Sequence, residues 1–366
     1  MWPPAASRRG RNRRALPFPC VRGAGFALVV VAALAAGPAA AQDAGVAPPA
    51  PALLDTVVVT GEQPGPGLWK VSRGEHVLWV FGTLAPLPRH MQWNAAQVEA
   101  VIAASQEFIS APQAAVSSDM GFFGRLSLLP SLIGVRENPG HAHLDTVLPP
   151  GLHARWRSRK AEYMGRDPKV ERWRPIFAAM ALYDAALRKR DLDAEPDIGK
   201  RLTRMATRAG IPVTPAKHTF TVAEPKAMIK AFKRSTLDDR ECLVRTLDRI
   251  DDDLGAMTSA ANAWATGDLD ALRAAPLGQS QWQACRDALA ETALLRSHGI
   301  VDVEARVREA WLAAAGDALE RNASSFAVVP ITLLLRPDGY LDALCAAHDC
   351  TVETPDAVDV AEPPAP

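Results

Sequence analysis

The sequence predicts a mixed α/β protein in which an N-terminal hairpin and C-terminal strands form a small central sheet, with a large helical insertion between them. Residues 68–72 and 76–81 are rich in Trp, Val, Leu and Phe and flank a short segment that contains Gly74, a pattern typical of two strands and a tight turn. Residues 326–331 form another apolar run of strand length. Between these regions, apolar residues recur mostly at helical spacing.

The elements after the hairpin extend this α/β pattern. Residues 94–106 have helical spacing, and residues 107–110 are expected to form a return strand. Residues 121–134 are apolar and are expected to form either a buried helix broken at Pro130 or a lid over a cleft. A long amphipathic helix is expected over 237–265, followed by further helices and a closing strand at 351–353.

Residues 1–41 are predicted to be a cleaved secretory signal peptide. They contain six arginines, an apolar run at 26–36 and the small-residue site Ala39-Ala40-Ala41. The apolar run is too short for a membrane span, and no transmembrane segment is expected in the mature chain. The expected organisation is a signal peptide (1–41), an Ala/Pro-rich leader (42–65), one domain (66–353) and a disordered tail (354–366), which implies a periplasmic protein.

The charge balance argues against a nucleic-acid partner. The whole chain has 41 basic and 41 acidic residues. Removal of residues 1–41 would take away six arginines and no acidic residue, and would leave 35 basic against 41 acidic residues. No basic stripe remains that would favour binding to nucleic acid.

Four cysteines remain after the predicted signal peptide, and an even number in an exported chain suggests two disulfides. Three connectivities are possible. We favour the pairs that lie close together in the sequence, Cys242–Cys285 and Cys345–Cys350.

Three places in the sequence resemble the TraB/GumN family, which includes the TIKI proteases. They are the opening strands with Gly82-Thr83, residues 261–268 (ANAWATGD), and residues 326–329 with 338–341. The second of these places is similar to the GumN-type branch. The resemblance covers residues 66–353 and implies a metal site made of two Gly-x-x-His turns and a Glu at the end of the strand that follows the first helix.

The residues that map to these ligand positions cannot bind a metal. The first turn maps to Gly82, Thr83, Leu84 and Ala85, so the His position is Ala85. The Glu position maps near Ala111, and the second turn maps to 330–333, where Leu333 takes the place of His and Thr332 precedes it. A catalytic metal needs about three protein ligands. We therefore expect no cofactor or metal, and a non-catalytic (pseudoenzyme) protein whose vestigial cleft is formed by Gly82, Thr83, Ala85, Thr332 and Leu333.

The resemblance leaves two main interpretations. In the first, the protein binds a periplasmic protein, peptide or glycan in the old cleft, in a cell-envelope or exopolysaccharide context. In the second, it is a metal-dependent hydrolase or peptidase with relocated ligands, for which the candidates are His90, Glu107, His141 and His143. A weaker third idea is that residues 55–61 (DTVVVTG), which resemble the energy-coupling box of outer-membrane transporters, contact such a transporter.

Overall fold

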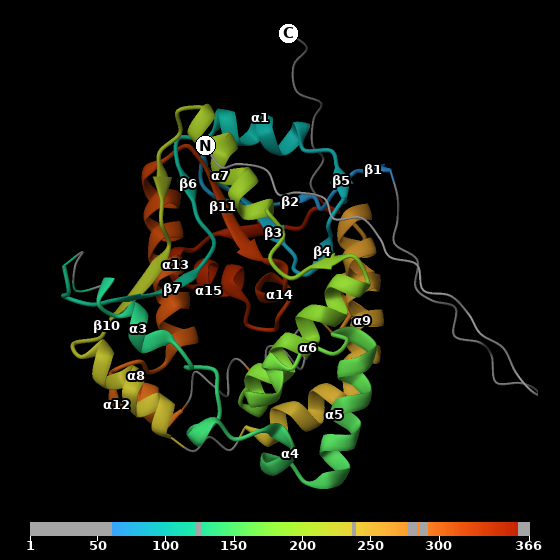
Figure 1. The fold of residues 1–366 in the computed structure, drawn as a ribbon. Helices are drawn as coiled ribbons and strands as arrows, with labels where there is room; N and C mark the ends of the chain where they lie inside the picture. The colour runs from blue at the N-terminus through green and yellow to red at the C-terminus, as the bar shows by residue number, and fades with distance from the viewer. Residues whose placement is uncertain are drawn as a thin grey trace, which may run out of the picture. The chain divides into compact units, whose positions relative to one another are not determined.

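The computed structural model describes residues 61–121, 124, 126–235, 239–276, 285 and 292–357 (Figure 1). The predicted signal peptide, the tail beyond 357 and most of the leader, including 55–60 of the transporter-like segment, lie outside these residues. The described part has a mixed α/β fold, as the sequence predicts.

The central sheet has six strands in the order β12-β2-β3-β11-β6-β9. Strands β3, β11, β6 and β9 run parallel to one another, whereas β2 is antiparallel to both of its neighbours. The strands are β2 (Leu68–Arg73), β3 (His76–Thr83), β6 (Phe108–Ile109), β9 (Val213–Thr214), β11 (Ser324–Pro330) and β12 (Thr351–Glu353). The predicted hairpin and the C-terminal strands therefore meet in one sheet.

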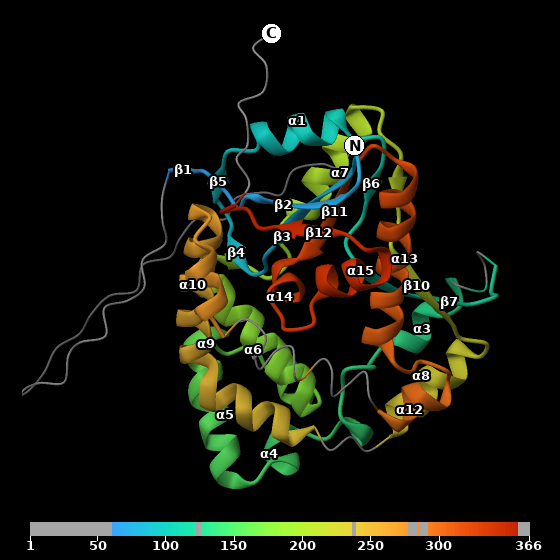
Figure 2. The same cartoon turned by 180° about the vertical axis from the view of Figure 1, so that it is seen from behind.

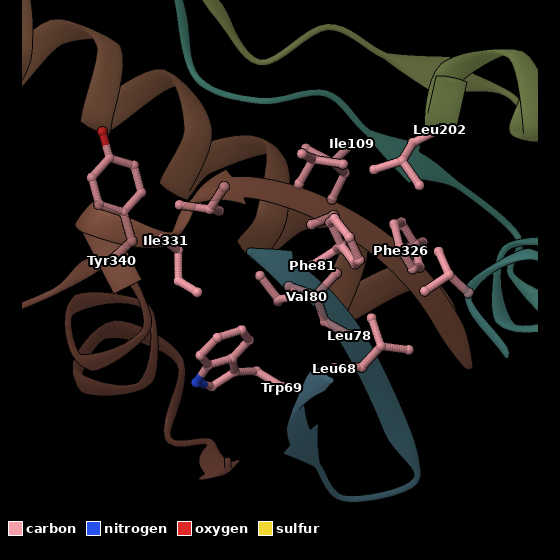
Figure 3. Packing of buried hydrophobic residues seen from close by; sticks show 14 of the residues in the cluster. Leu68, Trp69, Leu78, Val80, Phe81, Ile109, Leu202, Phe326, Ile331 and Tyr340 are labelled. Carbon is pink, nitrogen blue, oxygen red and sulfur yellow. The ribbon is translucent and has the colours of Figure 1, made fainter. Parts of the chain in front are cut away.

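The core of this sheet is built by strands β3 and β11, which pair over seven residues. Strand β3 consists mainly of aromatic and branched apolar residues, and the middle of β11 is the apolar run 326–329, which suits strands that are covered on both faces. Phe108 of β6 stacks on Phe326 of β11 at a ring distance of 5.6 Å. Figure 3 shows Phe326 among the packed apolar side chains of this core, with Phe81 and Ile109 nearby.

A second hydrophobic core lies within the helical insertion. It joins α4 (Leu144–Val147), α5 (Pro150–Tyr163) and α6 (Pro175–Lys189) to the first half of α9 (Arg240–Thr266). The second half of α9 belongs to the core of the sheet, where Trp264 packs edge-on against Phe81. The 27-residue helix α9 therefore connects the two cores.

The remaining elements complete the described structure (Figures 1 and 2). Three further two-stranded sheets are β1 (Glu62–Gln63) with β5 (Gln92–Trp93), β4 (Leu87–Pro88) with β8 (Leu192–Asp193), and β7 (Gln113–Ser117) with β10 (Lys217–Thr221). The other helices are α1 (Ala96–Ala104), α3 (Leu129–Leu132), η1 (Pro139–His141), η2 (Lys169–Arg172), α7 (Ile198–Arg208), α8 (Pro225–Arg234), α10 (Leu269–Ala274), α12 (Ala293–Ser297), α13 (Val303–Arg321), α14 (Ile331–Leu334) and α15 (Tyr340–His348). No helix in the described ranges is long and apolar enough to cross a membrane.

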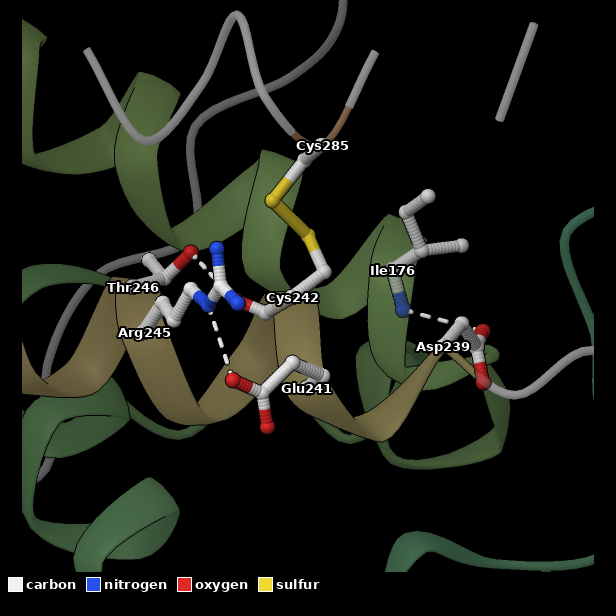
Figure 4. The surroundings of a disulfide bond; sticks show 7 residues. All are labelled: Ile176, Asp239, Glu241, Cys242, Arg245, Thr246 and Cys285. Carbon is white, nitrogen blue, oxygen red and sulfur yellow. Dashed lines mark hydrogen bonds and ion pairs between the residues drawn. A yellow bond between two sulfur atoms is a disulfide. The ribbon is translucent and has the colours of Figure 1, made fainter. Parts of the chain in front are cut away.

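The two disulfides connect the favoured cysteine pairs. Cys242 at the start of α9 is bonded to Cys285, with their Cα atoms 5.4 Å apart, and Figure 4 shows this bond beside Thr246. Cys345 of α15 is bonded to Cys350, with a Cα distance of 4.5 Å. The pairing predicted from sequence proximity is confirmed.

The apolar segment 121–134 differs from expectation. None of the residues of α3 is buried, and the side chains of Leu129 and Ile133 are 56% and 75% exposed. The described residues of the segment are also absent from the wall of the cavity presented below. The described part of the segment is therefore neither a buried helix nor part of the wall of that cavity. Phe122 and Phe123 lie outside the described residues.

Candidate functional site

The carboxyl ends of β3, β6 and β11 open into one large cavity of about 1580 Å³. Gly82 and Thr83 of β3 lie opposite Val329 and Pro330 of β11, so these two strands end at the same level. The parallel pairing of β6 with β11 brings Ala111 to the same edge of the sheet. Cavities at this edge are a common place for ligand sites in α/β proteins.

The three positions that the sequence analysis assigned to lost ligands meet in this cavity. Ala85, Ala111 and Leu333 all line it, as do Thr83 and Thr332. They follow three different strands, and Ala111 is more than 200 residues before Leu333 in the chain. The fold therefore brings together the positions expected of a shared site, and the side chains at those three positions are aliphatic.

Gly82 has a different role from the other predicted cleft residues, because it does not line the cavity. A Cβ atom at this position would lie 3.0 Å from both Trp69 and Ile331. Its carbonyl oxygen accepts a 2.8 Å hydrogen bond from the Trp264 indole N–H. Gly82 thus allows close packing of β2, α14 and α9 around the end of β3.

The wall of the cavity carries charged side chains that the sequence analysis did not single out. Arg249 and Asp253 of α9 form an ion pair at 3.8 Å, and Arg336 is paired with Glu304 of α13 at 2.5 Å. Asp253, the last of three consecutive aspartates, is only 6% exposed. The spacing of Arg249 and Asp253, four residues apart on one helix, was the available signal.

Two tyrosines of the cavity wall remain neutral at physiological pH. Burial raises the pKa of Tyr183, and the nearby Asp253 carboxylate raises it further. Burial and the Glu304 carboxylate likewise raise the pKa of Tyr340. The guanidinium of Arg308 lies over the Tyr340 ring at 5.7 Å and donates hydrogen bonds to the carbonyls of Asp338 and Gly339. These phenols can take part in hydrogen bonds but are not poised as bases.

The candidates for relocated metal ligands do not line this cavity. Glu107 precedes β6 and lies at the opposite end of that strand from Ala111. It accepts hydrogen bonds from Thr214 at 2.5 Å, Asn322 at 2.7 Å and Arg321 at 3.0 Å. Burial by itself would raise the pKa of Glu107, but these hydrogen bonds lower it below its ordinary value.

The candidate histidines lie elsewhere on the molecule. His141 contacts Glu137, and His143 accepts a hydrogen bond from Arg172 beside a smaller cavity of about 700 Å³. His90 is exposed after β4. Within the ranges that the structure describes, no three His, Cys, Asp or Glu residues lie close enough to hold a metal ion.

The fold and the site define an α/β protein with a cleft at the carboxyl ends of its parallel strands. The model of the TraB/PrgY/gumN family matches residues 67–354, and the chain belongs to this family. Comparison with curated proteins and with solved structures gave no match.

Proposed function

We propose that this chain is an exported, non-catalytic member of its family that binds a ligand in the cleft at the carboxyl ends of β3, β6 and β11. The observation that carries the proposal is the convergence of Ala85, Ala111 and Leu333 on one cavity. These are the positions where the resemblance expects metal ligands. Aliphatic side chains offer no lone pair to a metal, so the cleft keeps its shape while its ligands are absent.

The proposed ligand is a segment of a peptide or glycan in the periplasm, in a cell-envelope or exopolysaccharide context. The volume of about 1580 Å³ exceeds the ~300–1,000 Å³ of ordinary small-molecule sites. The cavity wall combines apolar side chains with paired charges and neutral tyrosines, which suits an extended ligand with both apolar and polar groups. A periplasmic location is supported by the predicted signal sequence and by two disulfides.

The metal content of the protein tests the non-catalytic part of the proposal. The chain would be purified from the periplasm after growth with manganese, cobalt and zinc, and its bound metal measured by mass spectrometry. We expect less than about a tenth of an equivalent, because a bound metal needs about three ligands. About one equivalent that is lost in a His90→Ala or His141→Ala variant would overturn the proposal and favour the relocated-ligand hydrolase.

A matched variant checks whether the three positions form one site. In the variant Ala85→His with Ala111→Glu and Leu333→His, three metal ligands, two His and one Glu, are placed after three strand ends. We expect this variant to gain close to one equivalent of metal, about the stoichiometry of a single site. If the folded variant binds no more metal than the unmodified chain, the three positions do not form a common site.

Ligand binding is tested by thermal unfolding in the presence of peptide and oligosaccharide panels, because a ligand that binds only the folded state raises the melting temperature. The control is the variant Ala85→Trp. Ala85 is exposed and lines the cavity, so an indole at this position would fill part of the cavity. A stabilising ligand should lose its effect in this variant. A ligand that stabilises both proteins equally does not bind in the cleft.

A further inference from the structure

Exposed aliphatic side chains are concentrated in one short segment of the described structure. Seven large hydrophobic side chains are exposed in the whole described structure. Four of them lie within the eight residues 126–133 around α3: Leu126, Leu129, Leu132 and Ile133. Their exposed fractions lie between 45% and 75%. A cluster of this kind is more informative than scattered exposed residues, because contiguous apolar patches mark interaction sites.

Helix α8 places a row of cations beside this segment. The ammonium group of Lys233 donates a 2.6 Å hydrogen bond to the carbonyl of Ile133. Lys226, Lys230 and Arg234 are exposed, and their spacing puts them on the same face of the helix as Lys233. In Figures 1 and 2, α3 and α8 lie side by side. We call the surface formed by these four cations and the four aliphatic side chains the α3–α8 face.

The rest of the molecule holds α8 in this orientation. The buried guanidinium of Arg174 donates hydrogen bonds to the carbonyls of Phe232 and Ser235 at the end of the helix, at 2.8 and 2.9 Å. Phe232 packs edge-on against Phe177, and Met228 packs against a small core with Phe220. The apolar face of α8 therefore points inward and its cationic face points outward.

The cations of the α3–α8 face differ from those on the neighbouring helices. On α5 and α6, Arg155, Arg159 and Lys189 are each paired with a carboxylate. Within the described part of the chain, no carboxylate is paired with Lys226, Lys230, Lys233 or Arg234. The nearest acidic residues in the sequence are Glu224, just before α8, and Asp238, four residues after Arg234. The face thus combines exposed aliphatic groups with unpaired positive charge.

We propose that the α3–α8 face docks onto an anionic lipid surface, with the aliphatic side chains entering the headgroup region and the cations contacting lipid phosphates. Basic residues beside an apolar face are the combination that binds interfacially to anionic membranes. A second copy of this chain fits less well, because a twofold contact through the same face would bring like charges together. Since α12 packs beside α8 and its Arg296 lines the cavity, docking would place the cleft rim near the headgroups.

Vesicle co-sedimentation of the mature full chain tests this inference. The probes are vesicles of phosphatidylcholine alone and of phosphatidylcholine with phosphatidylglycerol, at low and high salt. We expect binding to the anionic vesicles only, and weaker binding at high salt because salt screens the attraction. No binding to anionic vesicles, or equal binding to both compositions, would overturn the proposal.

Two pairs of substitutions separate the contribution of positive charge to vesicle binding from that of apolar burial. Lys230→Gln with Arg234→Gln should weaken vesicle binding about thirtyfold, since each basic residue near an anionic surface contributes ~1 kcal/mol. Leu129→Ser with Ile133→Ser should weaken it by at least about tenfold through lost apolar burial. The control pair Arg157→Gln with Arg208→Gln removes the same charge from α5 and α7, and we expect it to change binding less than about threefold, because screening confines the attraction to nearby charges.

We expect the variants to fold, because all the altered residues of the face are exposed. Unfolding measurements check this expectation. If both pairs of substitutions bind like the control, the face is not the docking surface. If they leave vesicle binding unchanged but shift a monomer–dimer equilibrium in solution, the occupant is a second copy and the lipid proposal is wrong. None of these outcomes depends on what the cleft binds.

Discussion

The two ends of the parallel strands use polar side chains in opposite ways. At the amino end of β6, Glu107 is 7% exposed and accepts hydrogen bonds from Thr214, Arg321 and Asn322. At the carboxyl ends, the positions expected of metal ligands carry Ala85, Ala111 and Leu333, which face a cavity. A polar group tied to several partners is difficult to replace, whereas a side chain that faces open space can change at little cost in stability.

The largest effect is expected from loss of the Glu107 carboxylate. Glu107→Ala should lower the free energy of unfolding by about 3 kcal/mol, because it removes a buried carboxylate that accepts three hydrogen bonds. Urea unfolding measures this change. The control is Asp270→Ala, which removes a 93% exposed carboxylate paired with Arg273 and should cost less than about 1 kcal/mol. Equal effects of the two substitutions would contradict the structural role of Glu107.

A side chain at Gly82 should produce the next largest effect. Gly82→Val would force atoms against Trp69 and Ile331 and should destabilise the fold by about 1–3 kcal/mol, measured by thermal unfolding. The matched glycine is Gly255 within α9, where an added Cβ meets no atom within 4 Å. Gly255→Ala should stabilise the protein by about 0.5–1 kcal/mol. A stabilising effect at Gly82 would show that the strand end is not closely packed.

The stability contribution of Glu107 should depend on pH. Hydrogen bonds lower its pKa in the folded state, so its ionised form stabilises the fold above the ordinary glutamate pKa of 4.5. That contribution should decrease as the pH falls through the lower pKa of the folded state. The difference in unfolding free energy between the unmodified chain and Glu107→Gln should therefore be constant near neutral pH and shrink below pH 4.5. A difference that grows on acidification would contradict the sign of this shift.

The smallest effect is expected at the carboxyl end. Ala111→Glu adds a carboxylate that can extend into the cavity and remain hydrated, so we expect a cost below about 1 kcal/mol in urea unfolding. This substitution is the reverse of Glu107→Ala, four residues away in the sequence. If the two substitutions lower the free energy of unfolding equally, the two strand ends do not differ in how well they tolerate a change of side chain.

Much of the fold could be predicted from local patterns. The hairpin, the strand β11 and helices such as α9 have clear periodicities, and the short sequence separations within each pair favoured the correct disulfides. The segment around α3 could not be read in this way, because apolar composition alone does not distinguish a buried helix from an exposed docking face. The burial of Asp253 likewise depends on neighbours that are distant in the sequence.

The sequence by itself determined the elements, the family resemblance and the absence of ligand-type side chains at Ala85, Ala111 and Leu333. Tertiary structure alone decided that these three positions meet in one cavity, that Glu107 lies at the other end of its strand, and that α8 lies beside α3. The physical reason is that secondary structure follows from neighbours along the chain, whereas a cleft or a surface forms only where packing brings distant segments together.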